Sequence, residues 1–145
     1  MAWRNKLREI LLKWDGTPYV DGQAVAGEGA NCVGSASGVA CELEGVPPIE
    51  FERLPSDTAM HRPDTARAAM HRLMRLHPRW KRMVAPRSAQ PGDMLVVGHG
   101  APGHLMIVGA HPNTLAHCVR PRFCITGMAL PSGMSLHALY RLEGI

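Results

Sequence analysis

The chain has 145 residues, of which 46% are hydrophobic and 19% charged, and its formal net charge is +4. This length suits a single domain over residues 1–145 that buries roughly two-thirds of its unfolded surface without disulfides or metals. No run approaches the about 18 apolar residues that a membrane span requires. Charged residues interrupt the N-terminal segment, so we expect that it is not a secretory signal. We therefore expect the protein to be synthesised in the cytoplasm.

Four cysteines are present, none in a C-x-x-C spacing, and a cytosolic origin argues against disulfides; they are Cys32, Cys41, Cys118 and Cys124. Much of the positive charge lies in residues 62–87. A solvated helix face explains this basic segment without any special purpose. Docking on an acidic partner is the main alternative, and nucleic-acid binding is the least favoured one, so we expect no nucleic-acid partner.

Apolar residues at helical spacing predict three helices, each ended by glycine or proline. The first two are predicted at residues 2–14 and 32–44, and the third begins at Pro63 or Asp64 and ends at Pro78. Residues 46–61 carry little regular signal. Residues 46–89 are therefore expected to be a partly helical, basic region between the second helix and the first strand.

Short apolar runs after Pro86 predict a series of strands. They cover residues 94–97, 104–108, 114–119, 123–126 and 136–142. Helices that precede a meander of strands are typical of an α+β fold rather than of alternating βαβ units. We therefore predict N-terminal helices packed on a C-terminal antiparallel β-sheet.

Cys32 stands where an irregular, glycine-containing segment enters the second predicted helix. Free backbone N–H groups and the helix dipole favour a thiolate at a helix N-terminus, which would make Cys32 a nucleophile. Most free cysteines are instead small buried core residues. Both interpretations stay open on this segment alone.

A thiol nucleophile needs a base and a third group that orients the base. If residues 109–112 form a four-residue hairpin loop, His104 lies opposite His117 on one face of the sheet. A sheet packed against the second helix would then bring His104 to Cys32, with His117 behind it. The competing hypothesis is a zinc site formed by Cys32, His104, His117 and Cys118. Its spacing matches no close metal-binding pattern, because successive side chains of a strand alternate in direction and Cys118 would face away from His117. We expect neither a metal nor a cofactor.

Five short motifs follow one another along residues 14–119. They are Trp14-Asp15-Gly16-Thr17-Pro18-Tyr19, Asn31-Cys32-Val33-Gly34, Gln90-Pro91-Gly92-Asp93-Met94, Gly103-His104-Leu105-Met106-Ile107-Val108-Gly109 and Leu115-Ala116-His117. In order and spacing they resemble the NlpC family, compact papain-like cysteine peptidases that act on bacterial cell-wall peptides. The resemblance implies that the helical, basic region 46–89 is an insertion in a single NlpC-type domain, and this short form is similar to versions found in phage tails and gene-transfer particles.

The resemblance implies a role for each matching residue. Cys32 matches the nucleophile, His104 the general base and His117 the residue that orients the imidazole, while Tyr19 matches a tyrosine near the oxyanion site. The implied reaction is hydrolysis of the amide between D-γ-glutamate and a diamino acid in the peptidoglycan stem. The implied setting is a virion or phage-like tail, made in the bacterial cytoplasm, with tail or hub proteins as partners.

The chain departs from the family beside the nucleophile. The usual Asp-Cys-Ser-Gly reads Asn31-Cys32-Val33-Gly34, and in the family the aspartate and serine help to receive the free amine of the stem peptide. Asn31 lacks the charge and Val33 lacks the hydroxyl, so these two positions bear on substrate choice. The alternative function is a structural tail or hub component that keeps the fold with little or no catalysis.

Overall fold

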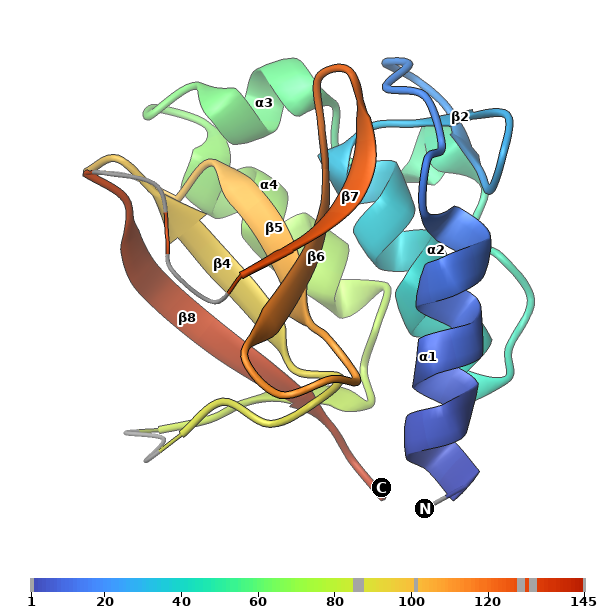
Figure 1. Cartoon of the computed structure of the whole chain (residues 1–145). Coiled ribbons are helices and arrows are strands. Elements are labelled where there is room, and N and C mark those ends of the chain that lie inside the picture. The colour runs from blue at the N-terminus through green and yellow to red at the C-terminus, as the bar shows by residue number, and fades with distance from the viewer. Residues whose placement is uncertain (1, 85–87, 101, 128–129, 131–132, 145) are drawn as a thin grey trace.

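The computed structural model describes residues 2–84, 88–100, 102–127, 130 and 133–144. Helices gather on one side of a six-stranded antiparallel sheet (Figure 1), whose strand order is β3-β8-β4-β5-β6-β7. This arrangement confirms the predicted α+β class. Within the described residues no helix has both the length and the apolar character that crossing a membrane would require.

The first two helices have the bounds that the sequence predicts. The helices are α1 (Ala2–Trp14), α2 (Cys32–Glu44), α3 (Asp57–His61) and α4 (Ala66–Arg75), with a 3-10 turn at Phe51–Arg53. α4 begins later than predicted because the Thr65 hydroxyl donates to the Ala59 carbonyl at 2.7 Å and folds the preceding residues back on α3. α3 was missed, since five residues are too few to show a helical period.

All five predicted strands form. The sheet consists of β3 (Trp80–Arg82), β4 (Met94–Gly98), β5 (His104–Val108), β6 (Thr114–Val119), β7 (Arg122–Gly127) and β8 (Ser135–Leu142), and a small hairpin joins β1 (Ala24–Val25) to β2 (Gly29–Ala30). β3 is not among the predicted strands, because two of its three residues are basic and exposed and only Trp80 is buried. It pairs with β8 at the edge of the sheet.

The register between β5 and β6 differs from the prediction by two residues. Val108 pairs with Leu115 rather than with Asn113. The Gly109 N–H donates to the Thr114 carbonyl at 2.8 Å, so the loop comprises residues 110–113, and Asn113 takes the left-handed φ of 60°. Since a shift of two preserves the side-chain face, the two histidines still share one side of the sheet.

α2 lies between the sheet and α1 and contacts β5 and β6. α1 approaches α2 closely where Gly38 faces the indole of Trp14, which is 3% exposed. A Cβ atom at position 38 would lie 2.4 Å from Trp14 Cζ2. The Trp14 Nε1–H also donates to Glu42 at 2.6 Å, so the indole cannot shift without losing that hydrogen bond. The absence of a side chain at Gly38 therefore sets the α1–α2 spacing.

An ion pair between a buried carboxylate and a partly exposed arginine joins the turn before β4 to β8. Asp93 is 1% exposed, and Arg141 donates to its two carboxylate oxygens at 2.9 and 2.8 Å. The same carboxylate accepts the Gln90 N–H at 2.7 Å and closes the Pro-Gly-Asp turn. This arrangement fixes the start of β4 and, through the sheet, the neighbouring β5.

We expect Gly38→Ala to lower the free energy of unfolding by about 1–3 kcal/mol, the usual cost of overpacking a core. The clash opposes a gain of about 1 kcal/mol in helix propensity, so a net loss shows that the close approach dominates. Urea unfolding followed by circular dichroism measures the change. The control is Gly127→Ala, where an added Cβ has no neighbour within 4 Å. Equal stability of the two variants would contradict this account of α1–α2 packing.

Candidate active site

Cys32 is the first residue of α2, and Asn31 holds that helix end. The Asn31 side-chain oxygen accepts the Gly34 N–H at 2.7 Å, which is the hydrogen bond of a helix N-cap. Its side-chain nitrogen donates to Asp21 Oδ1 at 3.0 Å. Asn31 thus acts structurally, and the neutral amide suits a position that must both accept from the helix and donate to a carboxylate.

The structure brings the three predicted catalytic residues together. The Cys32 sulfur and a ring nitrogen of His104 lie within 4.8 Å of each other. His104 Nε2 lies 2.8 Å from His117 Nδ1, and the two rings meet edge to face at 70°. Because Nε2 of His104 is engaged by His117, Nδ1 is the ring nitrogen left for the sulfur. The order of contacts is therefore thiol, imidazole, imidazole.

Burial sets the protonation of this group. It raises the pKa of the Cys32 thiol to about 12, although the backbone N–H groups of Leu105 and Val33 act in the opposite direction. Burial also lowers the pKa of His104 to about 3, helped by the nearby imidazoles of His117 and His61. The predicted stabilisation of a thiolate by the helix end is therefore wrong for this structure, because desolvation outweighs it. The resting pair is a neutral thiol beside a neutral imidazole.

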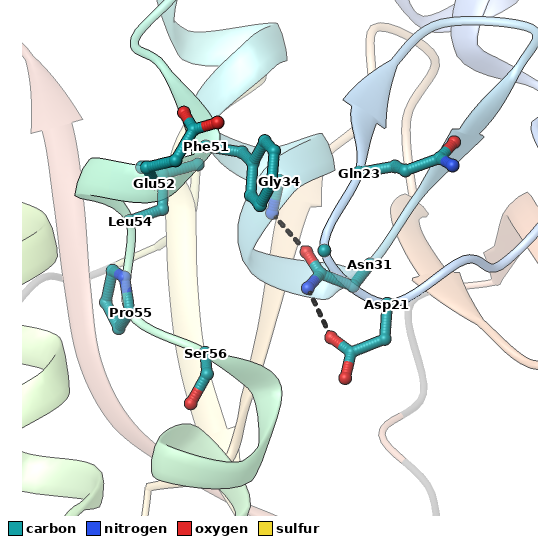
Figure 2. A pocket seen from close by; sticks show the side chains of 10 residues that line it. Asp21, Gln23, Asn31, Gly34, Phe51, Glu52, Leu54, Pro55 and Ser56 are labelled. Carbon is teal, nitrogen blue, oxygen red and sulfur yellow. Dashed lines mark hydrogen bonds between the residues drawn. The ribbon is translucent and has the colours of Figure 1, made fainter.

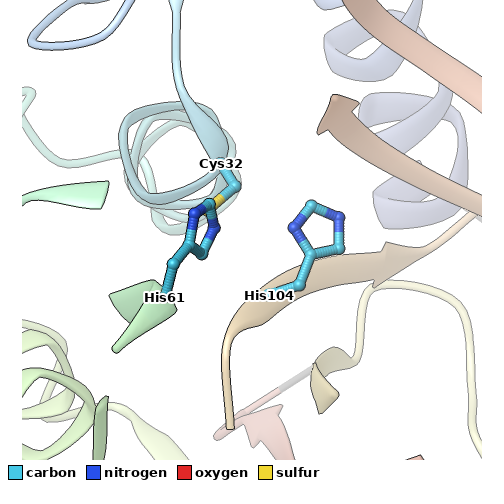
Figure 3. A group of neighbouring side chains, drawn as sticks. All are labelled: Cys32, His61 and His104. Atoms are coloured by element: carbon cyan, nitrogen blue, oxygen red, sulfur yellow. The ribbon is translucent and has the colours of Figure 1, made fainter. Parts of the chain in front are cut away.

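His61 is a site residue that the sequence did not reveal. It ends α3 and its Nε2 lies 4.0 Å from the Cys32 sulfur (Figure 3). Its side chain is exposed, whereas those of Cys32 and His104 are buried. The chain has eight histidines, and this one lies in a segment without periodicity. No sequence signal distinguished it from a surface histidine.

Two cavities are lined by neighbours of Cys32. One of about 390 Å³ is lined by His61, His104, Met106 and His117 among others. The other, of about 300 Å³, lies beside the start of α2 and is lined by Asp21, Asn31, Gly34, Glu52 and Ser56 among others (Figure 2). Residues between 51 and 56 line the second cavity, whereas His61 and Pro63 line the first, so this part of the chain borders both cavities.

The remaining predicted substrate residues have different surroundings. The Val33 side chain is fully buried in the core, which leaves only its backbone N–H for a substrate. Tyr19 is half-buried, and its backbone forms an isolated parallel β-bridge with Ala30, which lies two residues before Cys32. The Arg120 guanidinium lies 4.5 Å from the centre of its ring. The Tyr19 backbone thus lies beside the strand residue that precedes the start of α2 by two positions.

Cys118 points away from the histidines, as alternation predicts. Its sulfur donates to the Ala30 carbonyl at 3.2 Å. Among the described residues, the Cys/His/Asp/Glu group that is close enough to hold a metal ion contains Cys32, His61 and His104. The zinc set proposed from sequence, with His117 and Cys118, is therefore not assembled.

A serine–histidine–carboxylate arrangement, separate from the candidate site, lies in the core. Ser37 Oγ is 3.0 Å from His77 Nε2, and His77 Nδ1 is 3.5 Å from a Glu44 carboxylate oxygen. Ser37 and His77 are 2% and 1% exposed, and neither lines a cavity found among the described residues. These contacts join α2 to the segment after α4 and serve packing rather than catalysis.

Comparison of the sequence with known protein families and with curated proteins finds no match.

The buried histidine predicts acid sensitivity. Because the folded-state pKa of His104 is lowered to about 3, the unfolded chain binds a proton there first as the pH falls below about 6.5. Stability is therefore full above that pH and decreases toward pH 3, by on the order of 3 kcal/mol at pH 4. Urea unfolding across this range should show a weaker pH dependence for His104→Asn. The control His111→Asn, in the exposed hairpin loop, should keep the wild-type slope.

The raised pKa also predicts the reactivity of the thiol. At pH 7.5 we expect iodoacetamide to modify Cys32 at least tenfold more slowly than a cysteine in an unfolded peptide, whose pKa is about 8.5. The rate should continue to rise above pH 9. Mass spectrometry of digests measures Cys32 and the partly exposed Cys124 in the same sample. A Cys32 rate that levels off near neutral pH would indicate a thiolate–imidazolium pair instead.

Proposed function

We propose that this chain is a cysteine peptidase that hydrolyses the D-γ-glutamyl–diamino acid amide of peptidoglycan stem peptides. The observation that carries the proposal is the contact series from Cys32 to His104, within 4.8 Å, and from His104 to His117, at 2.8 Å. This is the nucleophile, base and orienting group that acyl transfer requires. The substrate class and a place in a phage or phage-like tail rest on the motif resemblance alone.

The chemistry follows from these positions. The Cys32 sulfur attacks the amide carbonyl carbon as its proton passes to His104. The resulting oxyanion is stabilised by the N–H groups at the start of α2, where the helix dipole is positive. The C–N bond breaks, and the leaving amine takes the proton from His104. Water, deprotonated by His104, then hydrolyses the thioester and restores the thiol.

The lowered pKa of His104 affects its removal of the thiol proton and its donation of that proton to the leaving amine in opposite ways. A base with a low pKa is a weak acceptor for the thiol proton. We therefore expect attack of the sulfur on the carbonyl carbon and transfer of its proton to His104 to occur together. The imidazolium formed is then a strong acid, which favours protonation of the departing amine. His117 holds the His104 ring at 2.8 Å in the orientation that both steps need.

Access to the sulfur requires movement of His61. Cys32 is 1% exposed, and the His61 ring at 4.0 Å occupies one approach to its sulfur. We propose that a stem peptide displaces His61 and lies along the two cavities. The smaller cavity presents the carboxylates of Asp21 and Glu52 beside Asn31. They offer the negative charge that Asn31 lacks, and so suit an amine of the substrate.

A structural tail or hub component is the second candidate. It is favoured by the concealment of the nucleophile and by the exposed basic side chains of α4 and the residues around it. The apolar face of α4, with Ala66, Ala69, Met70 and Leu73, is buried, which leaves its arginines in solvent. Such a surface suits docking to an acidic partner protein.

Incubation of the purified chain with muropeptides, followed by mass spectrometry, tests the peptidase. We expect new amine ends at the diamino acid, and a loss of at least 1,000-fold in rate for Cys32→Ala, on the order of other nucleophile removals. The matched control Cys124→Ala should keep wild-type turnover. Cleavage that survives Cys32→Ala would refute the proposal, and absence of cleavage by the wild type across stem peptides would favour the structural component.

A further inference from the structure

Three potential metal ligands converge at the site, and one of them is not needed for the proposed peptidase. The Cys32 sulfur and one ring nitrogen each from His61 and His104 all lie within 4.8 Å of one another. The three side chains come from α2, α3 and β5, and Figure 3 shows both rings beside the sulfur. Thiolate and imidazole are the ligands that zinc prefers in proteins.

The spacing is close to that of a tetrahedral site. With Zn–S near 2.3 Å and Zn–N near 2.0–2.1 Å, tetrahedral ligand atoms lie roughly 3.3–3.6 Å apart. The Cys32–His61 distance is 4.0 Å. A contraction of roughly 1 Å about a common centre would therefore complete the geometry. His61 can supply its own part of this contraction, because its side chain is exposed and it ends a helix of only five residues.

The surroundings supply the other features of a metal site. A metal-bound histidine usually uses its second ring nitrogen for a hydrogen bond that fixes the ring. His104 has that contact, since its Nε2 lies 2.8 Å from His117 Nδ1. His61 and His104 also line the cavity of about 390 Å³. A fourth coordination position could thus be filled from that cavity by water or a small ligand.

We propose that Cys32, His61 and His104 bind a single soft divalent metal ion, with zinc the best fit, and that the ion holds α3 over the nucleophile. On binding, the Cys32 thiol releases its proton to solvent and its sulfur bonds to the metal, without any change of oxidation state. The metal ion coordinates both the nucleophile Cys32 and the base His104, so neither is available for the peptidase reaction. Zinc is therefore a reversible inhibitor of the peptidase, a consequence that rests on the proposed function, whereas binding itself does not.

Cobalt provides a direct readout on the intact chain. Titration with Co²⁺ alone should produce tetrahedral visible bands together with a sulfur-to-cobalt charge-transfer band, saturating at one ion per chain, and Zn²⁺ should displace the Co²⁺. His61→Ala should weaken Co²⁺ affinity by at least the 10–100-fold typical of losing even an outer-shell partner. His71→Ala removes an exposed histidine of α4 and should bind like the wild type.

A second measurement does not depend on the optical spectrum. Zn²⁺ should protect Cys32 from iodoacetamide in wild type and His71→Ala at least tenfold more than in His61→Ala, with Cys124 as the internal reference. A spectrum without the charge-transfer band, or unchanged affinity and protection in His61→Ala, would overturn the site. Zinc that activates muropeptide cleavage would overturn the inhibitory role. Failure of the peptidase proposal would leave the cobalt spectrum and the protection unchanged.

Discussion

Packing of α2 against β5 and β6 holds Cys32 in position and also removes water from its sulfur. The helix end supplies N–H groups that favour negative charge, but a thiol that is 1% exposed pays a larger desolvation cost. Both the thiol and the adjoining imidazole are consequently neutral at rest. We therefore expect the sulfur to lose its proton only when it bonds to a substrate carbonyl carbon or to a metal cation.

The segment of residues 46–84 is part of the site. It contributes His61 above the nucleophile, a wall to each of the two cavities, and β3 to the edge of the sheet. Its basic helix keeps the charge in solvent and the apolar face in the core. The peptidase and metal proposals differ in the role that they give His61: the first requires its side chain to move away from the sulfur, and the second requires it to stay.

Local patterns predicted much of this structure. The bounds of α1 and α2 follow from apolar spacing and from glycine or proline stops. The placement of His104 and His117 on one face of the sheet was predicted despite an error in register, because a shift of two residues keeps the face. Three features were not predictable. The shift at Asn113 depends on one left-handed residue, the pKa of Cys32 depends on tertiary burial, and His61 reaches the sulfur through a five-residue helix without a pattern of its own.

The position of β8 has a consequence for the order in which the sheet can form. This strand is the last in the described chain, yet it lies between β3 and β4 and pairs with both. During synthesis β3 therefore has no paired strand among the described residues until residues 135–142 have left the ribosome, and Asp93 waits for Arg141 over the same interval. The helices and the β4–β7 meander precede β8 in the chain, so the pairing of β3 with the sheet follows theirs in the order of synthesis.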